Sequence, residues 1–324
     1  MPVGNSDRGV GLWAGQTMFS LDNHNQYIDW WHETEPGLGE DFDHKGTLST
    51  LVMTPTLTIG LSNYFNLSIA PNIGTRIMTW DSDSTTIHHR NENSLTDFTN
   101  SANGGILGDT KLLLRYLVFN DGKGEGKRMF IGGGLIMPSK NTLIADPFFL
   151  NGDEKKDHRH FAISEGVYKG LFEFQYYIKR VTNPVFIGAS MTIETPIKEN
   201  KYKYLSPKKY DFIFTALSNE LRFVKSAIST NLIYSHFSDA YWDGKQAPNS
   251  SGKLITFGVG LIKNLTTGTI GFSVQKPIFL EGGFSGADIK SSSLEQDVSV
   301  WQLQLSYRRV LKFTIPGLDP LKNI

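Results

Sequence analysis

The chain has 324 residues with 32 basic and 32 acidic side chains, so its formal net charge is zero. Proteins that bind nucleic acid are normally clearly basic, and this balance argues against that class. The sequence contains no cysteine, which excludes disulfides, thiolate metal sites and covalent c-type haem attachment on this chain. No stretch approaches the roughly 20 consecutive apolar residues that a membrane-spanning helix needs.

The first residues, MPVGNSDRGVG, lack the apolar core of a secretory signal peptide. Two interpretations follow: the protein is cytoplasmic, or the sequence is a mature form whose leader has been removed. The patterns further along the chain favour the mature form.

Apolar and polar residues alternate with a period of two in twelve stretches, each bounded by turn-forming residues. After Phe65, for example, Leu67 and Ile69 fall on one face while Asn66 and Ser68 fall on the other. The stretches are roughly 11–19 residues long, against about 5–6 in a typical globular strand. We expect strands near residues 9–20, 47–60, 65–80, 105–119, 128–138, 160–178, 185–198, 208–222, 227–238, 253–263, 269–280 and 297–313.

The connections between these strands alternate between short and long. Five are short (LSNYF, NDGKGEGK, KRVTNP, FVKSA and KNLTTG), and six are longer: residues 21–46, 81–104, 139–159, 199–207, 239–252 and 281–296. Strict alternation predicts an up-and-down antiparallel sheet with both chain ends at the short-turn edge. Transmembrane barrels have this asymmetry, with short periplasmic turns and longer extracellular loops.

A soluble sandwich and a membrane barrel give the same alternation, but mid-strand charges separate them. Asp109, Lys111 and Arg115 share one strand face, opposite Leu112 and Leu114. A closed barrel leaves no unpaired edge in lipid, and it would turn the apolar face to lipid and the charges to the lumen. The patterns at 128–138 and 208–222 leave the facing of those two strands open.

Aromatic residues also gather near the expected strand ends, as interfacial girdles do. Trp80 and Trp301 fall near the long-loop edge, and Tyr64, Phe65, Phe119, Tyr177 and Phe313 fall near the short-turn edge. The alternative is the general preference of strands for aromatic residues.

These patterns predict an all-β fold, a single antiparallel up-and-down transmembrane β-barrel of 12 strands. We expect one domain over residues 1–324, with 1–8 as a periplasmic N-terminal segment and 314–324 as a periplasmic C-terminal tail. The expected location is the bacterial outer membrane.

Several stretches resemble known outer-membrane barrels of Gram-negative bacteria. VWQLQLSYRRVLKF, residues 300–313, resembles their C-terminal assembly signal, although eleven residues follow it here. TPTLTIGLSNYFNLSIAPNIG, GDTKLLLRYLVF and FIGGGLIMPS resemble the transporter-like family of the MetA pathway of phenol degradation, distant relatives of long-chain fatty-acid channels. The resemblance implies uptake of a hydrophobic or small organic solute. No N-terminal plug like that of the fatty-acid channels is evident in the sequence.

The charges expected on the lumen face are the main candidate site. They are mixed in sign and could line a solute path and tune its selectivity. The alternative is an internal salt-bridge network that fills the barrel and conducts nothing. The set is Arg76, Asp109, Lys111, Arg115, Glu165, Lys169, Glu173, Glu194 and Arg308.

The first long connection, residues 21–46, contains Tyr27, Trp30 and Trp31. We expect this loop to cover or constrict the barrel mouth. Capping of the surface and partner binding are the alternatives.

Histidines and acidic clusters raise the question of a metal. We expect all eight histidines on the long-loop side. They could form a metal or cofactor site there, or they could gather there because lipid-facing and lumen-facing positions exclude histidine. DSDS at 81–84 and EDFD at 40–43 offer oxygen ligands for Ca²⁺ but lack the spacing of an EF-hand. We expect no dedicated metal site and no cofactor. The acids are expected to be solvated loop residues that divalent ions can bridge to lipopolysaccharide. The histidines are His24, His32, His44, His88, His89, His158, His160 and His236.

Two constellations could support hydrolysis at the rim. Ser235, His236 and Asp239 lie close in sequence, but adjacent strand residues point to opposite faces, so Ser235 and His236 cannot pair directly. A rim protease would use Asp81, Asp83, His88 and His89. We expect that the protein is not an enzyme.

The sequence therefore predicts an outer-membrane channel or transporter-like barrel that passes or binds a small organic or hydrophobic solute. A non-conducting structural or interaction barrel for periplasmic or surface partners is the alternative, and a rim hydrolase the third. Expected partners are outer-membrane lipid and lipopolysaccharide, the solute, and protein partners or further copies of the chain, with no nucleic acid.

Overall fold

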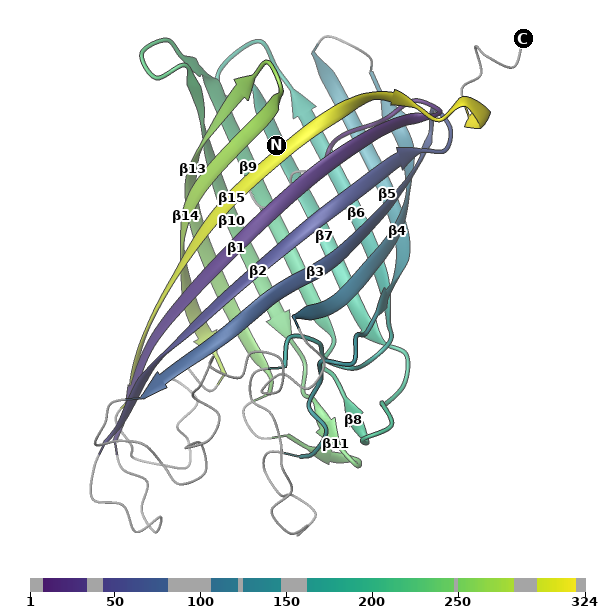
Figure 1. Cartoon of the computed structure of the whole chain (residues 1–324). Helices are drawn as coiled ribbons and strands as arrows, with labels where there is room; N and C mark the ends of the chain where they lie inside the picture. The colour runs from purple at the N-terminus through teal and green to yellow at the C-terminus, as the bar shows by residue number, and fades with distance from the viewer. Residues whose placement is uncertain are drawn as a thin grey trace.

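A computed structural model describes residues 8–33, 43–80, 106–121, 125–146, 162–247, 250–282 and 296–318. Twelve strands form a closed antiparallel barrel in which each strand pairs with its neighbours along the chain, and β15 closes against β1 (Figure 1). The predicted fold is confirmed. The barrel strands are β1 (Gln16–His32), β2 (His44–Gly60), β3 (Phe65–Trp80), β4 (Leu107–Asn120), β5 (Gly126–Met137), β6 (Lys169–Lys179), β7 (Phe186–Pro196), β9 (Lys209–Leu221), β10 (Ser226–Phe237), β13 (Gly252–Leu265), β14 (Gly268–Glu281) and β15 (Gln296–Thr314).

The first strand differs from the prediction. The strand expected at 9–20 and the loop expected at 21–46 are both wrong, because β1 runs from Gln16 to His32. Residues 22–26, DNHNQ, are polar on both faces, so the alternation that marks the other strands is lost there. Tyr27, Trp30 and Trp31 therefore lie in a barrel strand rather than in a mouth loop, and Tyr27 is exposed on the outer wall.

A second, smaller sheet lies at the long-loop end. It contains β8 (Tyr204–Leu205), β11 (Tyr241–Trp242) and β12 (Lys245–Gln246), in the order β12-β11-β8. Trp242 packs with Ala240 and Ala247 into a core of its own. These residues were expected in the connections 199–207 and 239–252. Two-residue strands are too short to show a period in sequence.

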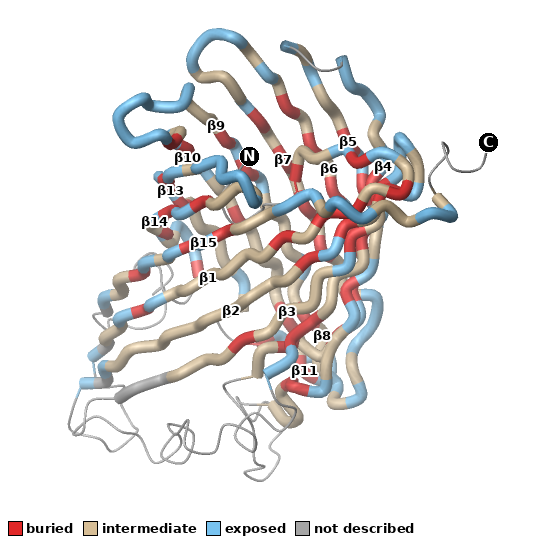
Figure 2. The backbone as a smooth tube through the Cα atoms, turned by 45° about the horizontal axis from the view of Figure 1, so that its top comes forward, coloured by how far each residue is buried: buried red, intermediate tan, exposed pale blue. Residues whose placement is uncertain are grey.

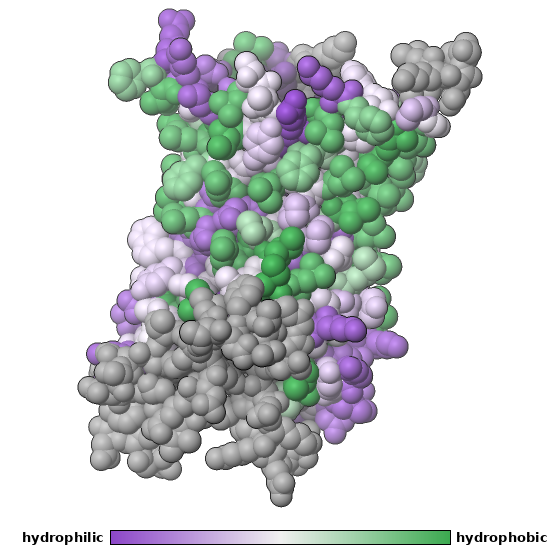
Figure 3. Space-filling model, in the orientation of Figure 1, coloured by the Kyte–Doolittle hydropathy of each residue, from purple (hydrophilic) through white to green (hydrophobic). Residues whose placement is uncertain are grey.

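The outer wall is apolar over the middle of the barrel. Figure 3 shows it as a green band, and buried and exposed residues alternate along the strands in Figure 2. The structure also shows which residues of β5 and β9, whose facing the sequence left open, point inward. Phe130, Ile136 and Ile213 are buried, while Ile131 and Phe214 are exposed on the outer wall. Among the described residues, no helix is long and apolar enough to cross a membrane.

Tyr177 does not belong to an aromatic girdle. Its side chain is buried, and its ring stacks on Phe186 with a centroid separation of 5.0 Å. The structure therefore corrects its expected place at the lipid interface. A Cβ atom at Gly188 would lie only 2.2 Å from this ring, so the neighbouring strand needs a glycine where the ring turns inward.

The wall is not fully paired at the long-loop end. β14 and β15 pair from Thr269 with Arg308 as far as Gln275 with Gln302, although both strands continue beyond that point. Pro277 lies two residues beyond Gln275, and proline has no N–H to contribute to a strand ladder. Beyond Gln275 and Gln302, β14 and β15 no longer pair with each other. On the β15 side of this gap lie β15, β1, β2 and β3, the four longest strands, which run obliquely together in Figure 1.

A charge on the lipid face should destabilise the barrel. Leu114 is exposed on the outer wall, and we expect Leu114→Arg to lower the free energy of unfolding in lipid vesicles by about 2–4 kcal/mol. Urea titration of vesicle-inserted protein measures this. Leu114→Met is the matched control and should change little, and an equally small effect of arginine would contradict the lipid-facing assignment.

Candidate functional site: the barrel interior

The inner wall is polar. Buried hydroxyl, amide and charged side chains come from nearly every strand of the barrel, and they follow the parity opposite to the exposed apolar residues. The charged members gather on β4, β6, β7 and β9. The inner face of β10, β13, β14, β15 and the first half of β1 is mostly neutral.

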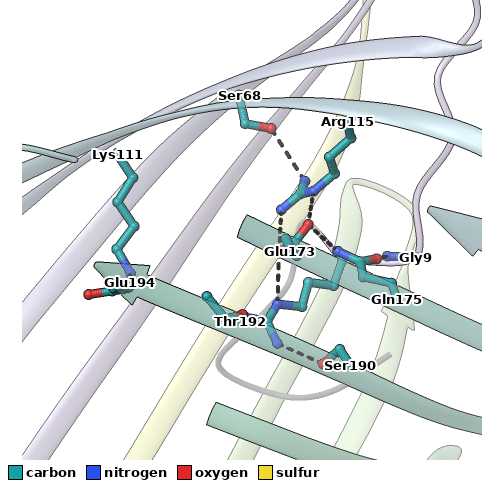
Figure 4. Close-up of polar contacts among 10 residues, drawn as sticks. Gly9, Ser68, Lys111, Arg115, Glu173, Gln175, Ser190, Thr192 and Glu194 are labelled. Carbon is teal, nitrogen blue, oxygen red and sulfur yellow. Dashed lines mark hydrogen bonds and ion pairs between the residues drawn. The ribbon is translucent and has the colours of Figure 1, made fainter. Parts of the chain in front are cut away.

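Glu173 on β6 is the centre of the first charge cluster. Its Oε1 lies 2.5 Å from Arg115 Nε, and its Oε2 accepts a hydrogen bond of 3.2 Å from Arg115 Nη2 (Figure 4). Gln175 Nε2 donates to Glu173 Oε1 at 2.7 Å. Glu173 and Arg115 are each 3% exposed. A buried carboxylate needs such paired donors, because an isolated buried charge is strongly unfavourable.

Arg8 reaches the same carboxylate from outside the strands. Its Nε lies 3.5 Å from Glu173 Oε2, and its two terminal nitrogens donate to Ser190 Oγ at 2.8 Å and Thr192 Oγ1 at 2.9 Å. Arg8 is 8% exposed. The residues just before β1 therefore lie against the inner wall of the barrel, which the sequence did not indicate.

Residues 9–12 continue this segment towards the start of β1. The backbone N–H of Gly9 donates to Gln175 Oε1 at 2.9 Å, and its carbonyl accepts from Arg128 Nη1 at 2.9 Å (Figure 4 shows the contact with Gln175). Val10 O accepts from Asn66 Nδ2 at 3.1 Å. Side chains of the wall thus satisfy the backbone of a segment that has no strand partner, as buried backbone groups require.

A second cluster lies closer to the long-loop end of the same strands. Lys111 Nζ and Lys169 Nζ lie 2.9 Å and 3.5 Å from the two carboxylate oxygens of Glu194. Lys169 also pairs with Glu165 at 2.6 Å. The four charges cancel within the cluster.

An apolar layer separates the two clusters. Leu113, Ile136 and Leu171 form a buried group on β4, β5 and β6. Leu113 lies between Lys111 and Arg115 along β4, and Leu171 occupies the equivalent place on β6. The layer keeps the ion pairs apart, so each cluster has to balance its own charge.

A third pair was not expected from the sequence. Lys209 Nζ lies 3.2 Å from Asp211 Oδ2, and Ser235 Oγ donates to Asp211 Oδ1 at 2.6 Å. His236 belongs to the other face of β10 and stacks on Tyr210. Ser235 therefore has an aspartate partner but no histidine, which agrees with the expectation that Ser235 and His236 cannot act together.

The neutral wall is lined by hydroxyls and amides. Gln275 Nε2 donates to Gln304 Oε1, and Gln304 Nε2 contacts His24 Nδ1, each at 3.0 Å. Ser229 Oγ and Ser273 Oγ are buried with no hydrogen-bond partner among the described residues. Their hydroxyls can still donate to or accept from water or a polar group.

Of the remaining predicted lumen residues, Asp109 lies close to Glu165 and Lys169 of the second cluster, whereas Arg76 and Arg308 lie apart from the clusters. Arg76 Nε donates to Thr50 Oγ1 at 3.3 Å in the outer half of β3, and Asp109 is buried at the start of β4. Arg308 lines a cavity of about 500 Å³ at the short-turn end. The structure thus brings Arg115 together with Glu173, and Lys111 and Lys169 together with Glu194, while a solute path along any of them stays a prediction.

The histidines do not form a site in the described part of the chain, which has no group of three or more metal-ligating side chains. His24 lies in mid-strand and contacts Gln304, so its expected place on the long-loop side is corrected. The side chains of His32 and His44 are not described. His88, His89, His158 and His160, with Asp81, Asp83 and the acids at 40–42, lie outside the described residues.

Sequence reasoning missed Arg8, Ser190, Thr192, Lys209 and Asp211. The only signal for Arg8 in the sequence is that GVGLW follows it, because the small residues of this stretch suit a segment that runs through a narrow space. Ser190 and Thr192 follow the alternation of β7 but carry no charge to attract notice.

The comparisons with known proteins concern the fold. A scan against protein-family models finds no match, and a search of curated proteins finds none. Among solved structures, an outer-membrane channel from Pseudomonas putida F1 aligns with a TM-score of 0.60 and 12% identity, covering 93% of this chain and 97% of that one. The chain shares the fold of an outer-membrane channel.

Other structures align less well. The toluene transporter TodX of P. putida has a TM-score of 0.40 at 9% identity, covering 91% and 89% of the two chains. A FadL homologue from Pseudomonas aeruginosa has a TM-score of 0.43 at 10% identity, covering 92% and 90%. The predicted resemblance to outer-membrane barrels is confirmed for the fold, which in the P. putida F1 protein serves a channel rather than an enzyme.

Removal of the central carboxylate should be costly. Glu173→Gln leaves Arg115 and Arg8 buried beside each other, and we expect a loss of about 3–5 kcal/mol in the free energy of unfolding. Urea titration in vesicles measures the loss. Lys253 and Glu281 form a pair on the barrel surface at 2.7 Å, and Glu281→Gln as control should cost at most about 1 kcal/mol. Equal effects of the two substitutions would contradict the central role of Glu173.

Proposed function

We propose that this protein is an outer-membrane channel for a small organic solute of low charge. The observation that carries the proposal is the polar interior of a closed barrel, crossed by a segment that side chains rather than strand pairing hold in place. The long loops would face the outside of the cell and the chain ends the periplasm, as in other outer-membrane barrels. The fold shared with a P. putida F1 channel supports the proposed channel function.

The charge arrangement favours a neutral solute. The charged side chains that gather on β4, β6, β7 and β9 form ion pairs with one another. A ring of like charges, which selects ions, is not formed by these pairs. The hydroxyls and amides of the opposite wall offer hydrogen bonds without a net charge, which suits phenolic or other small organic molecules.

Arg8 can leave the lumen without leaving the carboxylate of Glu173 unpaired. When Arg8 leaves, Glu173 keeps both of its contacts with Arg115 and its bond from Gln175. Ser190 and Thr192 lose one donor each but are uncharged. Displacement of residues 8–12 therefore costs hydrogen bonds but leaves no unpaired carboxylate.

The incompletely paired edge between β14 and β15 offers an entry from the side. Lys276 Nζ reaches across it to Ser299 Oγ at 3.1 Å and lies 4.6 Å from the centre of the Trp301 ring. Side chains rather than backbone bonds close this part of the wall. A hydrophobic solute dissolved in the outer leaflet could pass here once these contacts break.

The rival function is a barrel that conducts nothing and serves partner proteins. The ion pairs on β4, β6, β7 and β9 are the observation that favours it, since such a network fills a lumen. The two functions differ in conductance and uptake, which the next two experiments measure.

Loss of the Arg8 contacts should open the lumen. We expect Arg8→Ala to raise the open probability in planar bilayers at least about tenfold, because three contacts worth about 0.5–1.5 kcal/mol each are removed. Arg222→Gln, an exposed arginine in the turn after β9, is the control and should behave as the wild type. If Arg8→Ala stays closed in protein shown to be inserted, residues 8–12 do not control conduction and the scaffold is favoured.

Closing the β14–β15 edge should separate solute uptake from ion conduction. The chain has no cysteine, so Lys276→Cys with Trp301→Cys can be bridged selectively by a short bifunctional maleimide. We expect uptake of a hydrophobic aromatic probe into vesicles to fall severalfold while conductance is unchanged. Phe272→Cys with Leu305→Cys, already paired in register, is the control. Unchanged uptake after bridging would exclude the side entry.

A further inference from the structure

A groove outside the lumen has no role in the function proposed above. It has a volume of about 820 Å³ and lies beside the long-loop ends of β6 and β7. One wall is the segment 139–144, the other is the turn 198–203, and Gly166 to Tyr168 form the floor.

The walls carry an excess of positive charge. Lys140, Lys198, Lys201 and Lys203 all line the groove, against one acid, Glu199. Lys203 pairs with Glu199 at 3.2 Å, and this hydrogen bond raises the pKa of Lys203. Among the described residues, no carboxylate lies within ion-pair distance of Lys140, Lys198 or Lys201. Lys201 Nζ lies 4.8 Å from the centre of the Tyr202 ring. The positive charge of the three lysines is therefore not balanced by a carboxylate in the described part of the chain and is available to an anion.

The turn that carries three of these lysines is rigid. Asn200 Oδ1 accepts hydrogen bonds from the backbone N–H groups of Tyr202 at 2.8 Å and Tyr204 at 3.1 Å. Lys203, at the tip, has a positive φ of 68°, a conformation that this cap supports. The lysine backbones are therefore fixed before any ligand arrives.

The floor holds two unused polar atoms. Thr142 Oγ1 and Asn200 Nδ2 are buried and have no hydrogen-bond partner among the described residues. Both converge on Gly166, where an added Cβ would lie 2.3 Å from Thr142 Oγ1 and 3.0 Å from Asn200 Nδ2. The two groups that donate to Asn200 Oδ1 are backbone N–H groups of the turn. The NH₂ of Asn200, on the other side of the amide, is therefore directed away from the turn. A hydroxyl and an amide that can donate beside three lysines match an oxyanion.

The groove meets the lipid-facing wall. Tyr168, on its floor, is 53% exposed, and Ile197, whose N–H donates to Tyr168 O at 2.9 Å, is 60% exposed. Tyrosine favours the headgroup level of a membrane. In Figure 3, hydrophilic surface follows directly below the green band at the lower right, where Figure 1 places β8 and β11.

We propose that this groove binds a phosphate group on the headgroup of an outer-leaflet glycolipid. Lys140, Lys198 and Lys201 would supply charge, Thr142 and Asn200 would donate from the floor, and Tyr168 would pack against the sugar or the first acyl carbons. A lipid is favoured over a free anion because the groove opens onto the apolar wall, where the chains of the same molecule can lie.

The test measures binding of diphosphoryl lipid A to the full-length protein in detergent, by native mass spectrometry and by competition with a fluorescent lipid. We expect Lys198→Gln with Lys201→Gln to weaken binding about 25-fold, or about fivefold for each lysine. Thr142→Val should weaken it further with little change in volume. Lys208→Gln, an exposed lysine near the same end but outside the groove, is the matched control and should bind as the wild type.

Three results would overturn the proposal. The first is unchanged affinity in the double lysine variant, and the second is an equal loss in Lys208→Gln, which would indicate general attraction to lysine. The third is equally tight binding of inorganic phosphate with no added affinity from the lipid, which would make the groove a site for free anions. Circular dichroism and heat-modifiable migration on a gel confirm that each variant is folded, and conductance measured in parallel separates this proposal from the channel function.

Discussion

The need to pair every backbone N–H and C=O in hydrocarbon determines the rest of this structure. A strand in lipid has no water to satisfy its edges, so the sheet must close on itself. Closure sends alternate side chains outward and inward along every strand. The outward set can be largely apolar, as it is at Leu114, Phe214 and Leu303. The inward set then has to hold everything polar within a lumen that twelve strands leave narrow.

That confinement explains the charge pairs of the interior. A charged side chain on the inner wall can reach little bulk water, and the attraction of an opposite charge offsets its desolvation only when the geometry is good. Glu173 meets this condition twice over, through Arg115 and Arg8. In the proposed channel, the surplus of donors around this carboxylate would allow the N-terminal segment to leave the lumen without disrupting the wall. Under this proposal, stability would depend on Arg115 and opening on Arg8, two different partners of Glu173.

The two ends of the barrel differ for the same reason. At the short-turn end, tight connections such as residues 222–225 keep neighbouring strands paired to their tips. At the long-loop end, β14 and β15 separate after Gln275 and Gln302, and side chains such as Lys276 replace the backbone ladder. Polar and basic groups gather beyond the apolar band there, including the groove at Lys198 and Lys201. The proposed side entry for a solute and the proposed lipid-headgroup groove both lie at this end.

The period of two determined much of this protein from sequence alone, because lipid and lumen impose opposite polarity on neighbouring residues. It predicted twelve strands, most bounds within two residues, and the inward faces of Arg115 and Glu173. It failed at residues 22–26, where both faces of β1 are polar, so Tyr27 was wrongly placed in a loop. It also began the strand expected at 160–178 too early, because β6 begins only at Lys169. Only the tertiary structure decided which charges meet, because Glu173 and Arg115 are 58 positions apart in sequence. Only the tertiary structure also placed Arg8 inside the barrel, since no periodicity marks a segment that is held by side chains instead of a strand ladder.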